Sequence, residues 1–499
     1  MENDQKRAFA AVILSALILF SWQYFFAPKK PVPAATNQSA QEITTQSNAS
    51  GASSTTVDNN PRTGINNVDS VGQAQEKIID LKTESSSFSL KNSLLLGSLN
   101  NSEAIYSFDE VIGEQWPVQI LFKNKRGEVR VPNFSQVIER TENSVLLSNG
   151  TASMQFTLEN EGILKIKASN LGDNKLLFRF EAKEKDAGQG KVRSFIAYSK
   201  ALFKQAIGDD DQHDGALKWA GIDFKYHLFS MNFPTAVQST IRTSEINPNT
   251  NRAQMFIELG NQLDAIDFDL MYIKKNYDQL DARGNALQMS VDYGFFSLIS
   301  IPILRSLQFF YKYVGNYGIA IILLTILVRL ITFPLQYKSI KSMKKMQVIQ
   351  PELAKLKEKY KDNPQKMQQE SMALFKRTGA NPISGCFPML LQMPIFFAFY
   401  SVLRESIELV NAPFFGWIQD LSSKDPYYVI PVLMALAMFM QQKLTPSPST
   451  DPTQKKVMMF MPVIFGVFML NLPSGLTLYI LVSTLFGIGQ QLMVFKRMS

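Results

Sequence analysis

Residues 317–336 read YGIAIILLTILVRLITFPLQ, a run long and apolar enough to cross a bilayer, with Arg329 inside it. About twenty mainly apolar residues span a hydrocarbon core of roughly 30 Å, and an arginine near its middle costs about 2.5–3.5 kcal/mol. On a helix, Thr325, Thr332 and Gln336 would share one face with Arg329. We therefore expect that face to lie against protein or water. The plainer interpretation is that Arg329 extends to a lipid headgroup or pairs with a neighbouring carboxylate.

Five further apolar stretches predict a polytopic membrane protein, although apolar residues make up only 45% of the chain. The net charge of +8 gathers beside these stretches, which favours membrane topology and anionic lipid over sequence-specific recognition of nucleic acid. With six spans, every short basic loop falls on one side, which predicts that both chain ends are cytoplasmic. The further stretches are 8–27, 386–403, 427–442, 457–472 and 474–494.

The N-terminal part of the chain predicts an anchor followed by a linker. Residues 1–27 contain a basic start and a long apolar run that ends in aromatic residues, which favours an uncleaved signal anchor. A cleaved signal peptide is the alternative. Residues 28–76 are rich in Pro, Ala, Ser, Thr, Asn and Gln without apolar periodicity, so we expect a disordered periplasmic linker.

Residues 77–292 predict a large periplasmic domain of antiparallel strands arranged as a β-sandwich. The single cysteine, Cys386, excludes an intramolecular disulfide, so the domain must depend on its own apolar core. The acidic cluster at 209–214 is interpreted as a solvated loop, and we predict neither a metal site nor a cofactor. The strand candidates are SFSL, SMQFTL, ILKIKA, KLLFRF, AQMFIEL and FDLMYI.

Two amphipathic segments flank the span that contains Arg329. Residues 293–316 carry a polar stripe opposite aromatic residues, which predicts a helix lying in the membrane interface. Residues 338–378 are strongly basic and predict a cytoplasmic hairpin of two antiparallel helices. Its heptad-like seam begins with Met346, Ile349, Leu353 and Leu356, and Lys344 and Lys345 belong to its basic surface.

The apolar runs from 317 to the end contain no Asp, Glu or His, so Arg329 has no evident ion-pair partner and no catalytic set can be assembled. We therefore predict a protein that is not an enzyme. Polar residues on the other spans suggest a hydrated cavity around Arg329, although any single hydroxyl could instead bond to its own helix. The polar residues of this predicted groove are Thr325, Thr332, Gln392, Thr477, Ser483 and Thr484.

From residue 295 onward the chain resembles the YidC-type membrane protein insertases of Gram-negative bacteria, within the Oxa superfamily. The segments that carry the resemblance are VRLITFPL, ANPISGCFPMLLQMPIFFAFY, DPYYVIPVLMA, KVMMFMPVIF and LPSGLTLYILVS. The resemblance implies five core spans over 317–499, with Arg329 as the groove arginine, Gln392 in the QMP motif and Tyr479 on the last span. It also implies that nascent inner-membrane proteins, membrane lipids, the Sec translocon, the ribosome and the signal recognition particle receptor are partners.

The leading hypothesis is thus an insertase or chaperone that receives new inner-membrane proteins in a hydrophilic, positively charged groove. Two alternatives stay open at this point. An anion channel or transporter gated at Arg329 would require a continuous pore, and a scaffold would depend on the β domain while Arg329 would be dispensable.

Overall fold

The computed structural model describes residues 76–112, 116–183, 192–206, 210–247, 252–260, 263–361, 363–379, 387–445 and 452–497. The chain divides into two compact units, 1–63 and 64–499, and everything described here belongs to the second. The predicted anchor at 1–27 and almost all of the predicted linker at 28–76 lie outside the described residues.

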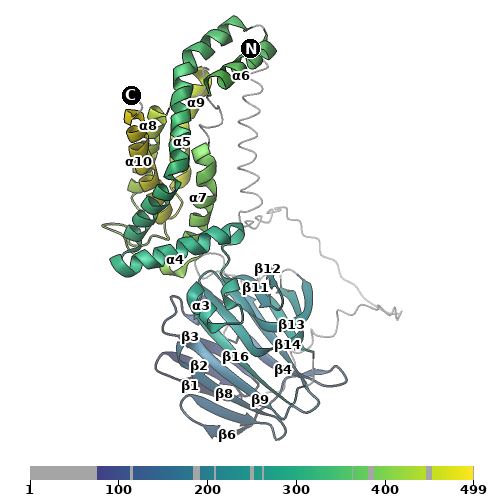
Figure 1. The fold of residues 1–499 in the computed structure, drawn as a ribbon. Coiled ribbons are helices and arrows are strands. Elements are labelled where there is room, and N and C mark those ends of the chain that lie inside the picture. The colour runs from purple at the N-terminus through teal and green to yellow at the C-terminus, as the bar shows by residue number, and fades with distance from the viewer. Residues whose placement is uncertain are drawn as a thin grey trace, which may run out of the picture. The chain divides into compact units, whose positions relative to one another are not determined.

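The β domain is one continuous sheet of 16 strands in which every pairing is antiparallel (Figure 1). All six strand candidates form strands, because their alternating apolar residues can bury one face of a pleated chain. The strands are β1 (Ile78–Lys82), β2 (Ser86–Lys91), β3 (Leu95–Asn101), β4 (Val118–Lys123), β5 (Val129–Arg130), β6 (Gln136–Arg140), β7 (Ser144–Ser148), β8 (Ser153–Glu159), β9 (Ile163–Ser169), β10 (Lys175–Lys183), β11 (Val192–Tyr198), β12 (Leu202–Ala206), β13 (Asp211–Phe224), β14 (His227–Asn247), β15 (Arg252–Leu259) and β16 (Ala265–Lys274).

The sheet folds over a single apolar core, so that its two end strands approach each other. The main path runs from β1 to β6, and side chains of β1 and of β7, the neighbour of β6, enter the same core. Arg140 of β6 donates from Nη2 to the carbonyl of Asp80 at 3.2 Å, and the Lys82 amide donates to the carbonyl of Glu142 at 3.0 Å. These contacts occupy backbone groups that a free edge would leave available for aggregation.

The acidic cluster is not a loop where it is described. Residues Asp211 to Asp214 begin β13 and pair with β14 across a register that joins Asp211 to Thr243. The Asp214 carboxylate accepts hydrogen bonds from Thr240 and Gln212, which lowers the pKa of Asp214. The long hairpin of β13 and β14 therefore supplies the order that the sequence composition did not predict.

His227 is a buried, neutral histidine at the start of β14. Its Nε2 accepts a hydrogen bond from the Ile105 amide at 3.2 Å, and its ring stacks on Tyr272 with centroids 5.2 Å apart. Burial, assisted by the positive charges of Lys274 and Lys275, lowers the pKa of His227 from 6.5 to about 4.

We expect acid to destabilise the β domain through His227. The unfolded chain binds this proton at a higher pH than the folded chain, so the contribution is complete above pH 6.5 and is lost as the pH falls toward about 4. The difference corresponds to about 3 kcal/mol of unfolding free energy. Denaturant unfolding of the protein between pH 7.5 and pH 4 measures it. His227→Gln should flatten the pH profile, and an unchanged slope would contradict the assignment, with His213→Gln as the matched control.

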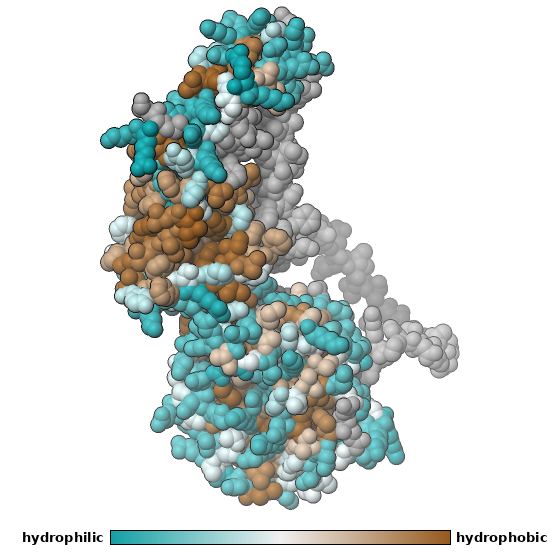
Figure 2. All heavy atoms as spheres, in the orientation of Figure 1, coloured by the Kyte–Doolittle hydropathy of each residue, from teal (hydrophilic) through white to brown (hydrophobic). Residues whose placement is uncertain are grey.

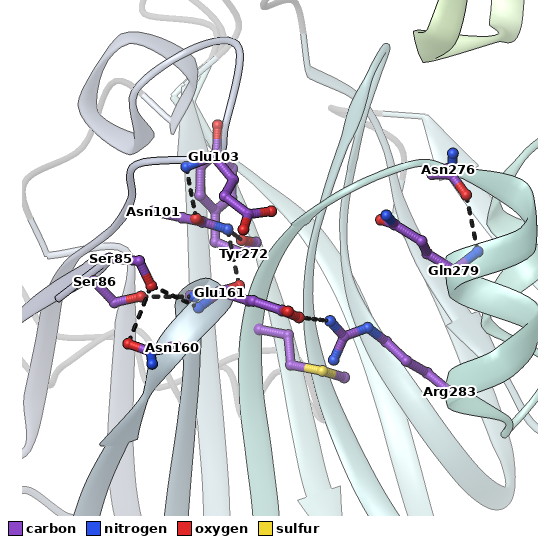
Figure 3. A network of polar contacts seen from close by, with 12 residues as sticks. Ser85, Ser86, Asn101, Glu103, Asn160, Glu161, Tyr272, Asn276, Gln279 and Arg283 are labelled. Atoms are coloured by element: carbon purple, nitrogen blue, oxygen red, sulfur yellow. Dashed lines mark hydrogen bonds and ion pairs between the residues drawn. The ribbon is translucent and has the colours of Figure 1, made fainter. Parts of the chain in front are cut away.

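A short helix, α3 (Tyr277–Arg283), is tied to the β domain by a polar network (Figure 3). Asn276 accepts from the Gln279 amide as its N-cap, and Arg283 forms an ion pair with Glu161. Glu161 has a positive φ of 63°, and the Asn101 side chain donates to its carbonyl at 2.8 Å. The first turn of α3 is thus capped by Asn276, and its last residue is tied to the β domain through Glu161.

Beside α3, Lys275 and Asp223 form a buried ion pair. Their side chains are 1% and 3% exposed, and Lys275 Nζ lies 2.7 Å from Asp223 Oδ1. Lys275 Nζ also donates to the Phe224 carbonyl at 3.2 Å. Because both charges are removed from water, each depends on the other.

The C-terminal part is helical, with a band of apolar side chains over its surface (Figure 2). Among the described residues, three helices are long and apolar enough to cross a membrane: Gly294–Val314, Tyr317–Lys359 and Ser474–Arg497; Val429–Leu444 and Met458–Met469 are shorter apolar helices. Helix α10 packs along both α5 and α8, and α9 packs along α8. The helices are α4 (Ser297–Val314), α5 (Tyr317–Lys359), α6 (Pro364–Thr378), α7 (Phe387–Glu405), α8 (Val429–Leu444), α9 (Pro452–Met469) and α10 (Ser474–Arg497).

Helix α5 begins against the loop that follows α7. Asn316 is its N-cap, accepting from the Ile319 amide at 3.1 Å, and its Nδ2 donates to the Phe414 carbonyl at 3.0 Å. Gly318 lies so close to the Phe414 ring that an added Cβ would stand 2.0 Å from its Cδ2 atom. The glycine therefore permits this close approach.

We expect Gly318→Ala to lower the free energy of unfolding by about 1–3 kcal/mol, because the methyl group would displace the Phe414 ring. Thermal unfolding of the purified protein in detergent measures the change. Combining Gly318→Ala with Phe414→Ala should cost less than the sum of the two single changes. Full additivity would show that the two residues do not compete for one space.

Helix α5 continues without interruption beyond the apolar run and forms the first helix of the predicted hairpin; α6 is the second. Met346 and Ile349 are 5% exposed and pack with Leu353 and Phe375. Leu356 lines a pocket between the two helices together with Leu374 of α6. Lys345 is exposed, and Lys344 donates from Nζ to the Phe495 carbonyl at 3.1 Å near the end of α10. The seam residues thus join α5 to α6, and Lys344 joins α5 to α10.

Candidate functional site

Arg329 points toward α10 and is held there by neutral groups. Its Nε donates to Ser483 Oγ at 2.8 Å, and its Nη1 donates to Gln336 Oε1 at 3.2 Å. Gln336 in turn donates from Nε2 to Thr332 Oγ1 at 3.0 Å. A polar chain therefore runs along one face of α5 and crosses to α10, as the spacing of these residues along the helix suggests.

Tyr479 extends this chain toward α7. Its hydroxyl accepts a hydrogen bond from Gln392 Nε2 and also interacts with Ser483. Its ring stacks on Phe399 with centroids 4.4 Å apart and an interplanar angle of 16°. Tyr479 is only 2% exposed, so it is a packed connection between α7 and α10 and not a free surface.

Three predicted threonines bond to their own helices. Thr325 Oγ1 donates to the Ile321 carbonyl at 2.6 Å, Thr332 to the Val328 carbonyl at 2.9 Å, and Thr477 to the Ser474 carbonyl at 2.9 Å. Thr484 is 5% exposed. These three hydroxyls therefore bond to their own helices, which was the alternative to a role in a hydrated groove. Ser483, Gln392 and Thr332 form hydrogen bonds with other side chains of the polar chain.

Glutamine side chains also lie near Arg329. Two of them, Gln441 and Gln490, were not among the predicted groove residues. Gln490 Nε2 donates to the backbone carbonyl of Arg329 at 3.3 Å, and Gln491 Nε2 donates to the Leu444 carbonyl at 3.0 Å. Gln490 stands seven residues after Ser483, a spacing that places both on one face of α10. That spacing was the signal that could have identified Gln490.

Within the described part of the chain, no carboxylate lies within ion-pair distance of Arg329. Two of the five guanidinium N–H groups have the acceptors given above, and none is described for Nη2. The side chain is partly exposed. The site is therefore a cation in a shell of neutral dipoles, with donors left for water or for a polar ligand.

The described residues contain no group of three or more His, Cys, Asp or Glu side chains that could hold a metal ion. Arg329 and the neutral dipoles around it can supply electrostatic attraction and hydrogen bonds. Long apolar helices around a partly buried arginine define a multi-pass membrane protein with a polar site inside its helical part.

Comparison with known proteins identifies the family. Residues 309–499 match the family described as 60Kd inner membrane protein. The chain is 32% identical to the membrane protein insertase YidC of Geotalea daltonii and 33% identical to that of Syntrophus aciditrophicus, each over 99% of both chains. It is also 43% identical to the YidC insertase of Nitratidesulfovibrio vulgaris strain DP4, over 59% of this chain and 57% of that relative.

A solved structure described as an active YidC insertase with the first transmembrane domain resolved matches with a TM-score of 0.39 at 18% identity. The match covers 84% of this chain and 92% of that one. By its likeness to the two relatives that match over their full length, the chain belongs to the YidC family of membrane protein insertases. These relatives are named for a role that involves no chemical transformation of a substrate.

Proposed function

We propose that this protein inserts and helps to fold newly made inner-membrane proteins, receiving them at a positively charged groove that contains Arg329. The observation that carries this proposal is the state of Arg329, a cation whose described contacts are all neutral. An uncompensated cation attracts the acidic or polar segment of a passing chain more strongly in a medium of low dielectric constant than in water.

The groove lowers the cost of moving a polar tail because it replaces part of the water that the tail loses. Side chains of Ser483, Gln336 and Gln392 supply dipoles at the depth of the apolar helices. An apolar segment of the same substrate can meanwhile contact lipid and the exposed apolar side chains of α8 and α9. The proposed groove is open to the cytoplasm and to lipid, and closed to the periplasm.

The proposed topology has six spans with both termini in the cytoplasm and the β domain in the periplasm. The burial pattern of helix α4 favours an interfacial position, because Ile303, Leu304 and Leu307 are buried while Leu298 and Phe309 are exposed. Its length and composition alone would also permit a span. Modification of cysteines placed singly in the β domain and in the hairpin of α5 and α6, tested from each side of sealed vesicles, measures the topology.

The hairpin is proposed to meet the acidic or anionic partners of the insertase. Exposed lysines such as Lys345 suit anionic lipid, the ribosome or the signal recognition particle receptor. We also propose that the protein acts either alone or together with the Sec translocon, as its family resemblance implies.

Site-specific photocrosslinking tests the groove directly. Stalled nascent chains of a small inner-membrane protein should crosslink to probes at Gln392 and Thr332, which are partly exposed beside the polar chain. A probe at Leu436 on α8, which is 55% exposed, is the control for contact with lipid. Equal crosslinking at all three positions would contradict a groove, and normal insertion after depletion of the protein would contradict the insertase function itself.

A further inference from the structure

Three helices meet beside Gly487 of α10. A Cβ added to this glycine would lie 3.1 Å from Gln441 Nε2 on α8 and 3.5 Å from Arg329 Nη1 on α5. Gly487 is buried, and an added Cβ would make an ordinary van der Waals contact with the guanidinium and a tight contact with Gln441. A longer side chain at this position and the observed Arg329 side chain would therefore compete for one volume.

Gly487 is part of a track on α10 that holds Arg329 at several points. Ser483 accepts from the guanidinium, Gly487 faces it, and Gln490 donates to the Arg329 backbone carbonyl. The spacings of four and three residues place all three positions on the same helix face. A glycine inside a helix costs up to about 1 kcal/mol relative to alanine, so its presence here calls for a local reason.

The Gln490 amide supplies an independent sign of a tightly shaped polar site. Its side chain is 5% exposed and its Oε1 has no hydrogen-bond partner among the described residues, although its Nε2 is bonded to α5. A buried acceptor without a partner is costly unless water reaches it. The surroundings of Arg329 therefore include a buried acceptor, Gln490 Oε1, that has no hydrogen-bond partner among the described residues.

We propose that Gly487 is a positioning residue: because it carries no side chain, the Arg329 guanidinium can lie against α10 and direct its positive charge along that helix. This inference rests on the proposed function of Arg329. It predicts that filling the space displaces the charge without removing it, so that substrates with acidic translocated tails suffer while those with neutral tails do not.

A double-mutant cycle on the purified full-length protein tests the shared space without reference to insertion. Gly487→Leu should lower the midpoint of thermal unfolding by about 3–6 °C, because the added atoms meet Arg329 and Gln441. In the Arg329→Ala background, the part of that shift that comes from contact with Arg329 should disappear, while the part that comes from Gln441 should remain. Gly487→Ala, which introduces only the contacts described above, provides a milder variant if Gly487→Leu does not fold.

Gly489 provides the matched control. It lies two residues away on the same helix, and a Cβ there would have no atom within 4 Å. Gly489→Leu therefore changes helix propensity equally but should show no coupling to Arg329→Ala. Equal coupling for both glycines, or none for Gly487→Leu and Gly487→Ala, would overturn the assignment.

Insertion assays on the same variants separate this inference from the proposed function. Gly487→Leu should reduce the insertion of a substrate with an acidic tail about tenfold. It should reduce the insertion of a substrate with a neutral tail less than about twofold. Coupling in unfolding without any loss of insertion would refute the role of Arg329 in insertion while retaining the packing relation. A substrate-independent loss would refute the positioning role, because that role acts through charge.

Discussion

Arg329→Ala is expected to reduce insertion of substrates with acidic translocated tails by about tenfold or more. The change removes the cation that Ser483 and Gln336 hold among the apolar helices, and a hydrogen bond to a charged group contributes about 1.5–3 kcal/mol. Each 1.36 kcal/mol lost corresponds to a tenfold change. Pulse labelling with protease protection of the translocated tail, in cells depleted of the wild-type protein, measures the effect.

Arg329→Lys is the matched variant for this prediction. Lysine retains the positive charge but lacks the planar arrangement of donors that reaches both Ser483 and Gln336. If insertion depends on the charge, Arg329→Lys should therefore retain most of the insertion activity. The same tail with its acids changed to Asn or Gln should be insensitive to Arg329→Ala. Equal losses with acidic and neutral tails would contradict an electrostatic role.

Asp223→Ala is expected to destabilise the β domain by about 3–5 kcal/mol, because Lys275 would lose its carboxylate partner while both positions are almost fully buried. Trp219, which is buried on the neighbouring part of β13, should make the transition visible by tryptophan fluorescence during denaturant unfolding.

The control for Asp223→Ala is the exposed pair of Lys167 and Asp267, whose side chains are 63% and 58% exposed. Asp267→Ala should change the free energy of unfolding by less than about 1 kcal/mol. Replacing both members of the buried pair, with Asp223→Leu and Lys275→Met, should recover much of the loss. If Asp223→Ala lowered the free energy of unfolding no more than Asp267→Ala does, the buried pair would not be needed for the stability of the β domain.

The sequence predicted local structure well because the relevant patterns are local. Alternation in β8 and β9 reflects the pleat of a single strand, and the stripe containing Arg329 reflects one turn of helix after another. The antiparallel β domain and the helical membrane part were therefore foreseen. The single folded sheet was not, because its strand order depends on pairings between residues that are far apart in the chain.

The predicted groove shows the same limit. Arg329 and Ser483 were both identified, but their contact joins positions 154 residues apart and depends on how α5 packs against α10. Gln490 and Gly487 were missed for that reason. The prediction that the acidic cluster is a loop was wrong because these residues pair with strand β14, and local composition gives no information about that pairing.

Helix α5 also has a mechanical consequence. It is 43 residues long, from Tyr317 to Lys359, which is about 64 Å at 1.5 Å per residue. Arg329 and the seam of the hairpin therefore belong to one continuous helix. No loop stands between them to absorb a displacement. A rigid tilt of the hairpin would therefore also displace the part of α5 that carries Arg329. Two prolines, Pro334 and Pro351, lie inside this helix, and at each of them the ladder of backbone hydrogen bonds lacks one donor, so bending is expected at these positions.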